Sequence, residues 1–184
     1  MSILLFVLLS SPELNDSLQK TERSNIELTV DSESVRWGRG NTSLRGGGLG
    51  LALVGRYPLT PALVLRGDGR LSFGTASLSV DGARIAPPST PTYLSTDLAF
   101  GAEWLLTRRW SVHTSLSRTG FMFSSANVIG RFTSGFGLNT GIAYRWRPIG
   151  GLELHAHLSV QASRLSDRSN TVRLNGGVGA GWVF

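Results

Sequence analysis

The feature that most constrains the fold is the regular alternation of residue types over the last fourteen positions, residues 171–184. From Val172 onward every second residue is apolar or glycine, and this set ends with Trp182 and Phe184. The intervening set is polar or small, and it includes Arg173, Asn175 and three glycines. A repeat of two residues places the two sets on opposite faces of an extended strand. The chain is therefore predicted to end in a strand with one apolar face, longer than most strands of soluble domains.

The same alternation recurs in seven earlier segments, which predicts an all-β protein. The eight predicted strands are residues 25–35, 46–57, 62–78, 93–106, 110–123, 132–146, 152–165 and 171–184. Turn residues such as Gly, Pro, Asn and Ser separate these strands. An even number of long alternating strands predicts an eight-stranded antiparallel up-and-down β-barrel of the transmembrane type, spanning residues 25–184.

The composition favours a barrel whose exterior faces lipid. Only 16% of the residues are charged, compared with about 25% in soluble domains. No apolar run reaches the roughly 18 residues that a spanning helix requires. The apolar run 3–9 predicts a shortened secretory signal, with a membrane-lying anchor or a misread upstream sequence as alternatives. The rest of the N-terminal segment, residues 1–24, is expected to be a flexible lead-in.

The cysteine content and the net charge exclude several classes of protein. The chain has no Cys, which excludes a disulfide framework and a thiolate metal site. The net charge of +6 comes almost entirely from arginine, since Lys20 is the only lysine. The arginines form no continuous run, and no nucleic-acid motif is present. Anionic lipid headgroups are therefore the expected partner, and no nucleic acid is expected.

The connections and the aromatic residues predict an orientation in the bilayer. The turns after the second, fourth and sixth predicted strands are short, and the connections after the first, third and fifth are longer, which is typical of periplasmic turns and extracellular loops. Aromatic residues favour the two interfaces of a bilayer. The expected periplasmic girdle consists of Tyr57, Trp110, Tyr144, Trp146, Trp182 and Phe184. The expected extracellular girdle consists of Phe73, Tyr93, Phe121, Phe123 and Phe132.

The terminal Phe184, with Trp182 two places before it, resembles the C-terminal assembly signal of bacterial outer-membrane β-barrels. The strand pattern and strand count over residues 25–184 resemble the small OmpA-like and OmpX-like outer-membrane barrels, although no family-specific motif is present. This resemblance implies insertion into a Gram-negative outer membrane by the barrel-assembly machinery, which would recognise the last strand. It further implies a structural, surface-interaction or adhesion role without catalysis, and no cofactor is expected.

The strand faces opposite the apolar ones are predicted to line the lumen. By this alternation the inward charged residues are Glu27, Asp31, Glu33, Arg56, Arg66, Asp68, Arg70, Asp97, Glu103, Arg145, Glu153 and Arg173. Eight strands leave an interior only just wide enough for side chains, and charges buried there must pair. A salt-bridged plug is therefore expected, and a wide aqueous channel is not.

The histidines suggest two further kinds of site. Glu153, His155 and His157 share one strand face, but a metal ion would need a third ligand from a neighbouring strand, and membership of the luminal network is the simpler interpretation. Two H-x-S pairs, at residues 113–115 and 157–159, look like part of the His/Ser/Glu set of outer-membrane lipid A deacylases. The first pair, however, is expected beside a periplasmic turn, whereas that chemistry requires the outer leaflet. No metal site and no enzyme are predicted.

Arginines gather in or beside the predicted extracellular loops. The candidates for contact with lipopolysaccharide phosphates are Arg36, Arg39, Arg45, Arg84, Arg131 and Arg168, with Arg164 beside them. A solvated basic rim is an equal alternative. The expected function is an integral outer-membrane barrel with a structural or surface-interaction role. The alternatives are a narrow channel for small solutes of the OmpW-like kind, a lipid A-modifying enzyme, and a soluble lipocalin-type barrel, which would carry its charged face outward.

Overall fold

The computed structural model describes residues 24–85, 90–124 and 132–184. The predicted signal-like run, residues 3–9, lies outside this range. The strands are β1 (Asn25–Arg39), β2 (Thr42–Thr60), β3 (Leu63–Val80), β4 (Ala83–Ile85), β5 (Thr92–Leu105), β6 (Trp110–Ser124), β7 (Thr133–Ile149), β8 (Leu152–Leu165) and β9 (Asn170–Val183). Within the described residues, no helix is long and apolar enough to cross a membrane.

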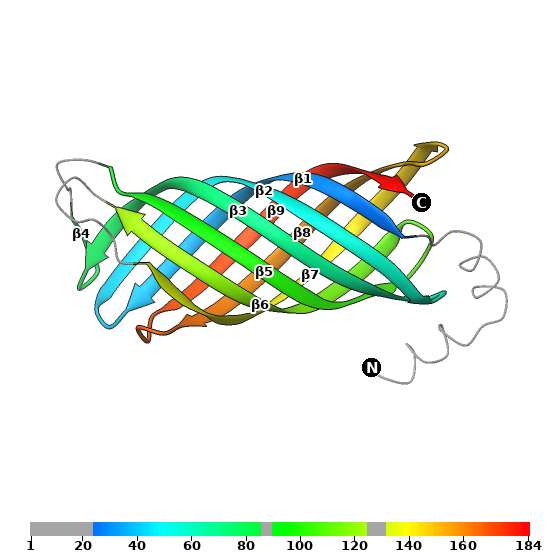
Figure 1. Cartoon of the computed structure of the whole chain (residues 1–184). Coiled ribbons are helices and arrows are strands. Elements are labelled where there is room, and N and C mark those ends of the chain that lie inside the picture. Colours follow the sequence, from blue (N-terminus) through cyan, green and yellow to red (C-terminus); the bar gives the residue numbers. More distant parts are fainter. Residues whose placement is uncertain (1–23, 86–89, 125–131) are drawn as a thin grey trace.

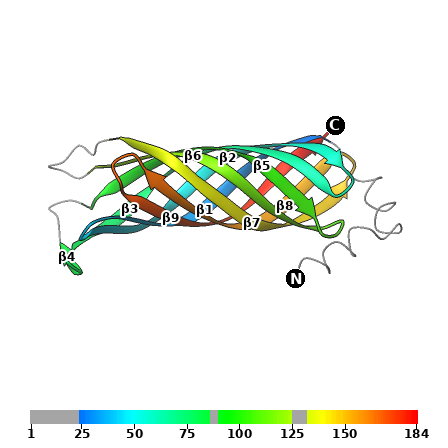
Figure 2. The same cartoon turned by 90° about the horizontal axis from the view of Figure 1, so that it is seen from below.

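The eight long strands form one closed antiparallel barrel (Figures 1 and 2). Each long strand pairs with the next along the chain, and the pairing of β1 with β9 closes the sheet. The three-residue strand β4 pairs only with the end of β3 and lies outside the ring. Apart from this short hairpin, the fold is the predicted eight-stranded up-and-down barrel.

The two ends of the barrel differ in their connections. One end, here called the terminal end, holds the C-terminus and the start of β1 together with the short turns β2–β3, β5–β6 and β7–β8 (Figure 1). The opposite end, here called the distal end, holds the β1–β2 turn and the β3–β4 hairpin. The long strands have 14 to 19 residues, whereas a tilted strand crosses a bilayer in about 9 to 11. The barrel is therefore longer than a hydrocarbon core is thick.

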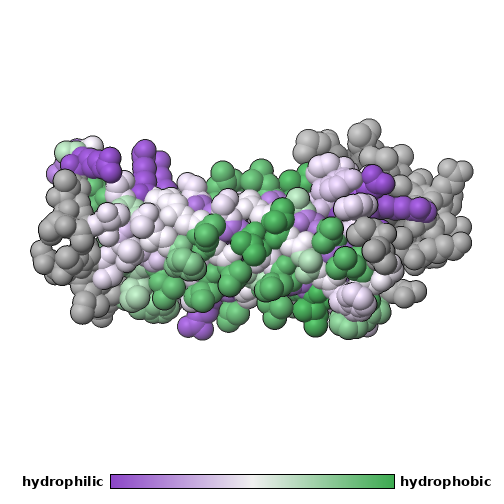
Figure 3. All heavy atoms as spheres, turned by 90° about the horizontal axis from the view of Figure 1, so that it is seen from above, coloured by the Kyte–Doolittle hydropathy of each residue, from purple (hydrophilic) through white to green (hydrophobic). Residues whose placement is uncertain are grey.

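The outward faces of the strands carry large, exposed apolar side chains. Leu98, Leu116 and Phe136 point outward and are 70%, 72% and 73% exposed. Figure 3 shows hydrophobic side chains across the middle of the wall, with hydrophilic side chains mainly toward the two ends. Large apolar side chains this exposed are unusual on proteins in water, and a lipid solvent accounts for them. The alternation predicted from the sequence therefore has its apolar face outward, which excludes the lipocalin-type arrangement.

Aromatic residues form an outward girdle at the terminal end, as predicted. Tyr57, Trp146, Trp182 and Phe184 are each more than half exposed there, and the ring of Trp110 packs edge-on against Tyr144 with centroids 5.0 Å apart. At the distal end the prediction was wrong for several aromatic residues, because their side chains lie inside the barrel.

An apolar cluster, here called the distal cap, lies in the lumen near the distal end. Its buried members are Val35, Trp37, Leu44, Ala76, Tyr93, Phe121 and Leu165, with Phe123 packed against them. The rings of Tyr93 and Phe121 stack with centroids 5.8 Å apart. Both residues had been expected in the outward girdle, but alternation places them on the luminal face of β5 and β6. Packing against the other cap residues removes their apolar surface from water.

The connection between β1 and β2 is much tighter than predicted. Residues 36–45 had been expected to form a loop, but β1 continues to Arg39 and β2 begins at Thr42, so that the turn holds only Gly40 and Asn41. Gly40 has a φ of 56°, which a glycine adopts without steric cost. The strands extend this far because the inward residues Trp37 and Leu44 belong to the distal cap.

Candidate functional site in the barrel lumen

The carboxylate of Glu103, on β5, is the centre of a charged cluster near the terminal end. Arg56 of β2 donates from Nε to Glu103 Oε2 at 2.7 Å, and Arg66 of β3 approaches the same oxygen at 3.7 Å. Arg145 of β7 and the hydroxyl of Ser111 of β6 both donate to Oε1. Five neighbouring strands of the ring thus converge on one carboxylate, which is 0% exposed.

Two further carboxylates complete this cluster from the other side of the lumen. Arg56 also pairs with Glu27 of β1 and lies 3.4 Å from Glu153 of β8. Asn25 donates to Glu27 at 2.9 Å and to Glu153 at 3.1 Å. Arg147 donates from Nε to Glu153 Oε2 at 2.6 Å. We call these residues, together with those around Glu103, the terminal ionic cluster.

Arg147 was missed because the sixth predicted strand ended at Trp146. β7 in fact continues to Ile149, and simple continuation of the alternation past Arg145 would have placed Arg147 on the luminal face. Its side chain is 30% exposed, consistent with a position near the mouth of the barrel.

Two acid–arginine pairs lie further along β3. Arg66 Nε contacts both carboxylate oxygens of Asp68 at 3.0 Å. Arg70 Nε lies 2.9 Å from Asp31 Oδ2 of β1, which is separated from β3 only by β2. Bidentate and charge-assisted contacts of this kind are stronger than neutral hydrogen bonds. β3 therefore contributes alternating charges that are partnered both within the strand and with β1.

The two histidines of β8 each face a carboxylate of β1. His155 Nδ1 is 3.1 Å from Glu27 Oε2, and His157 Nε2 is 3.2 Å from Asp31 Oδ1. Their rings stack with centroids 5.7 Å apart. No group of three His, Cys, Asp or Glu side chains that could hold a metal ion exists in the described part of the chain. The arrangement thus consists of two separate pairs.

A second charged cluster, here called the distal ionic cluster, lies between the histidines and the distal cap. Arg173 of β9 donates from Nη1 to Asp97 Oδ2 of β5 at 2.6 Å and from Nη2 to Asp97 Oδ1 at 2.5 Å. Thr119 and Gln161 each donate to Asp97 Oδ1 at 2.8 Å. Arg173 is 0% exposed. The alternation predicts that Asp97 and Arg173 are luminal charged residues, but it does not single out Thr119 and Gln161. These two uncharged side chains donate the remaining hydrogen bonds to the Asp97 carboxylate.

The glycines of β9 make room for these luminal side chains. A Cβ atom at Gly177 would lie 2.2 Å from the carboxylate of Asp31, and one at Gly181 would lie 2.3 Å from Glu27. One at Gly179 would lie 2.4 Å from the ring of His155. Separations this short are not possible between non-bonded atoms. The glycine run in the last strand is therefore required by the side chains that face it.

His113 lies on the luminal face of β6 and is 1% exposed. Its ring packs above Gly141 of the neighbouring β7, where an added Cβ would lie 2.6 Å from the imidazole. A lipid ester in the surrounding bilayer cannot reach a side chain enclosed by the barrel wall. This position argues against the lipid A deacylase alternative.

The predicted lipopolysaccharide-contact arginines are spread around the distal end. Arg36 and Arg45 are exposed cross-strand partners on β1 and β2. Arg39 is 3.8 Å from Asp167 in the β8–β9 turn. Arg84 on β4 and Arg168, which has a φ of 66°, are also exposed. These residues are exposed at the distal rim and do not converge on one site, and Arg131 lies outside the described residues.

Comparison with known proteins identifies the fold through structure and not through sequence. No family model matches the chain, and no curated protein matches it in sequence. The attachment invasion locus protein Ail of Yersinia pestis, in complex with the heparin analogue sucrose octasulfate, superposes with a TM-score of 0.57 and 14% identity, over 89% of this chain and 100% of Ail. Neisserial surface protein A gives a TM-score of 0.56 and 14% identity, over 89% and 100% of the two chains.

The outer-membrane protein OprG of Pseudomonas aeruginosa also superposes, with a TM-score of 0.56 and 7% identity, over 89% of this chain and 97% of OprG. All three comparisons cover nearly the whole of the solved chains at very low identity. They bear on fold, and they agree with the closed ring, the strand count and the apolar exterior described above. The chain has the fold of the small eight-stranded bacterial outer-membrane β-barrels.

Proposed function

We propose that this protein is an integral outer-membrane barrel with a closed lumen, and that its role is structural or lies in interactions at the cell surface. The observation that carries this proposal is the state of the luminal charges. Glu27, Glu103, Glu153 and Arg173 are all 0% exposed. A side chain that lined a water-filled pore would be accessible to water, and these side chains are not.

The closure has several layers along the barrel axis. The terminal and distal ionic clusters each draw side chains from strands on opposite sides of the ring. The distal cap adds an apolar barrier, and at the terminal end Val64 and Leu105 form a smaller apolar contact. An ion crossing the lumen would have to separate buried ion pairs, each costing several kcal/mol. These layers favour a structural role for the barrel and argue against a role as a channel.

We propose that the distal end faces the cell exterior and contacts lipopolysaccharide. The exposed distal arginines Arg36, Arg39, Arg45, Arg84 and Arg168 support this assignment, because guanidinium groups bind phosphates bidentately. One of the similar barrels, Ail, was solved with the polyanion sucrose octasulfate. The β3–β4 hairpin extends past the ring at the same end and adds exposed surface (Figure 1).

We further propose that the barrel-assembly machinery recognises β9. The outward face of this strand ends on Trp182 and Phe184, which are 55% and 66% exposed. The inward face of its second half carries Gly177, Gly179 and Gly181, which leave room for side chains of β1 and β8. β9 therefore has an apolar outward face before closure, and the contacts of these glycines with β1 form only when β1 pairs with it.

Conductance across a planar bilayer tests the closed lumen against the narrow-channel alternative. The purified, refolded chain should produce no steady openings in symmetric salt, because the ionic clusters leave no water path. A conducting eight-stranded barrel inserted in the same bilayers would show that the assay detects small pores. Reproducible openings of the wild-type chain, abolished when it is heat-unfolded before addition, would contradict the proposal and favour the channel.

A further inference from the structure

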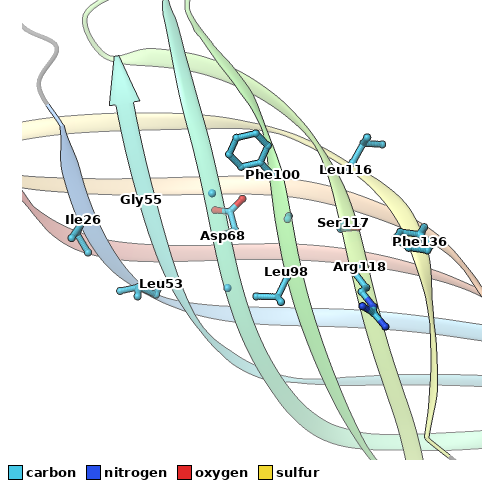
Figure 4. Close-up of a pocket in the computed structure, with 13 residues that line it drawn as sticks. Ile26, Leu53, Gly55, Asp68, Leu98, Phe100, Leu116, Ser117, Arg118 and Phe136 are labelled. Carbon is cyan, nitrogen blue, oxygen red and sulfur yellow. The ribbon is translucent and has the colours of Figure 1, made fainter. Parts of the chain in front are cut away.

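The outer wall of the barrel carries an apolar groove across β2, β3, β5 and β6. Its floor is formed by three outward-facing glycines, Gly55, Gly67 and Gly69, where the absence of side chains hollows the surface. Leu98, Phe100 and Leu116 stand along its sides, and its volume is about 660 Å³. Figure 4 shows Leu98 of β5 and Arg118 of β6 side by side, with Phe100 and Leu116 further along the same two strands.

Among the described residues that line this groove, Arg118 is the only outward-facing charged one. It is exposed, and it lies between Leu98 and Phe136 in the cross-strand register. Asp68, whose backbone also borders the groove, has its carboxylate bound to Arg66 at 3.0 Å. The net charge that the groove presents is therefore positive. A second groove of about 730 Å³ adjoins it toward the distal end and also includes Arg118.

The depth of Arg118 in the wall can be estimated from its strand. Arg118 follows the girdle residue Trp110 by eight positions on β6. Eight residues rise about 26 Å along a strand and, at a tilt of about 40°, about 20 Å along the barrel axis. The apolar band of such barrels is about 25 Å tall. Arg118 therefore lies near the boundary between hydrocarbon and headgroups on the distal side, where lipid phosphates are found.

A second arginine lies close to Arg118 on the same outer face. Arg164 of β8 is exposed, and it is separated from Arg118 in the register only by Phe136 of β7. Strands are about 4.8 Å apart, so the two Cα atoms are about 10 Å apart, and both guanidinium groups can reach one phosphorylated headgroup. The groove floored by Gly55 and Gly67 runs from Arg118 toward the terminal end, which is the direction an acyl chain takes from that headgroup.

We propose that this wall is a binding site for one lipid A molecule, with a phosphate held by Arg118 and Arg164 and an acyl chain lying in the glycine groove. The site includes Arg164, which lies beside the arginines of the distal rim, and adds Arg118 and the glycine groove to them. The inference rests on the proposed outer-membrane location with the distal end outward. Charge complementarity selects an anionic lipid, and the outer leaflet at that depth supplies lipid A.

The test measures lipid bound to the folded full-length chain in detergent by native mass spectrometry. The probes are bisphosphorylated lipid A, its monophosphorylated form and phosphatidylglycerol. Wild type should bind bisphosphorylated lipid A the most tightly. Arg118→Gln should weaken this binding about tenfold, because a charge-assisted contact to phosphate is lost. Gly67→Leu should weaken it as well, since the added side chain fills the groove, and a Cβ there meets only Phe100 at 4.0 Å.

Two matched controls should leave the binding unchanged. Arg108→Gln removes an exposed arginine from the β5–β6 turn at the terminal end. Gly176→Leu adds the same side chain to the outer face of β9, where a Cβ would be in ordinary contact with Leu158 at 3.6 Å. Equal binding by wild type and Arg118→Gln would overturn the phosphate site, and equal binding by Gly67→Leu would overturn the acyl groove. Phosphatidylglycerol binding as tightly as lipid A would overturn the assignment to lipid A.

Insertion of the same samples into vesicles separates this inference from the proposed function. Folded barrels normally migrate differently on gels before and after boiling, so folding and insertion can be scored directly. Variants that insert but have lost no lipid A affinity count against the lipid site alone. A wild-type chain that failed to insert would instead count against the outer-membrane proposal.

Discussion

At the scale of single residues, individual carboxylates in the lumen each contact several arginines. Glu103 accepts from Arg56 and Arg145 and lies 3.7 Å from Arg66. Removing one member of a buried ionic cluster lowers the free energy of unfolding by more than the whole cluster contributes to it, because the remaining charges stay buried without a partner. The stability of the barrel should therefore be far more sensitive at Glu103 than at any acid on its rim.

We expect Glu103→Gln to lower the free energy of unfolding by about 3 to 5 kcal/mol. The measurement is tryptophan fluorescence during urea unfolding of the chain in lipid vesicles. Asp167→Asn is the matched control: Asp167 lies 3.8 Å from an Arg39 side chain that is 61% exposed, and exposed pairs contribute about 1 kcal/mol or less. Asn also keeps the oxygen that accepts from Ser169. A Glu103→Gln barrel as stable as the control would show that the cluster is not held together by charge.

At the scale of the element, lipid-facing and luminal residues alternate along most of each long strand. β8 illustrates this most clearly, since its burial alternates from Leu152 to Leu165 without interruption. Leu158 and Val160 are 51% and 44% exposed, whereas Ser159 and Gln161 are each 2% exposed. A shift of one residue in register would exchange the two sets.

The absence of native cysteine makes this alternation directly testable. Single cysteines at positions 158 and 160, labelled with a fluorophore, should be quenched by brominated lipid, because they face the hydrocarbon. Cysteines at positions 159 and 161 should resist labelling in the folded barrel and react only after unfolding. Equal labelling at all four positions in folded protein would contradict the register of β8.

At the scale of the whole molecule, the luminal side chains form separate layers along the barrel axis. The terminal ionic cluster includes Ser111, and the distal cap includes Phe121, ten positions further along β6. This separation is about 33 Å along the strand, and the two layers share no contact among the interactions described above. They should therefore stabilise the barrel independently, and each should be sufficient to block ions.

We expect Phe121→Ala to cost about 3 to 5 kcal/mol, as for other buried phenylalanines. Combined with Glu103→Gln, the two losses should add to within about 0.5 kcal/mol, because the sites are distant. The readout is the same urea unfolding, accompanied by planar-bilayer recordings of both single variants, which should remain silent. A strong coupling energy, or openings from Phe121→Ala alone, would show that the distal cap is the main barrier and that the layers are not independent.

By itself, the sequence determined the number of long strands, the closed up-and-down order and which charged residues of the predicted strands face inward, because a period of two in residue type is a local property of each strand. Asp97, Glu103, Arg145 and Arg173 could all be assigned to the lumen in this way. Tertiary structure alone decided which charges meet, since Arg56, Glu103 and Glu153 come from β2, β5 and β8 and are brought together only by closure.

Tertiary structure also decided how far the strands run and which side chains fill the distal lumen. Gly40, Asn41 and Ser43 are typical loop residues, so the sequence predicts a loop around them. The inward residues on either side of them in fact belong to strands. Trp37, Phe121 and Leu165 form one apolar cluster only because β1, β6 and β8 meet inside the ring. Alternation distinguishes two faces but does not say where the bilayer ends. Near the edge of the bilayer, an inward aromatic residue is therefore distinguished from an outward girdle residue by its packing in the structure and not by the alternation of the sequence.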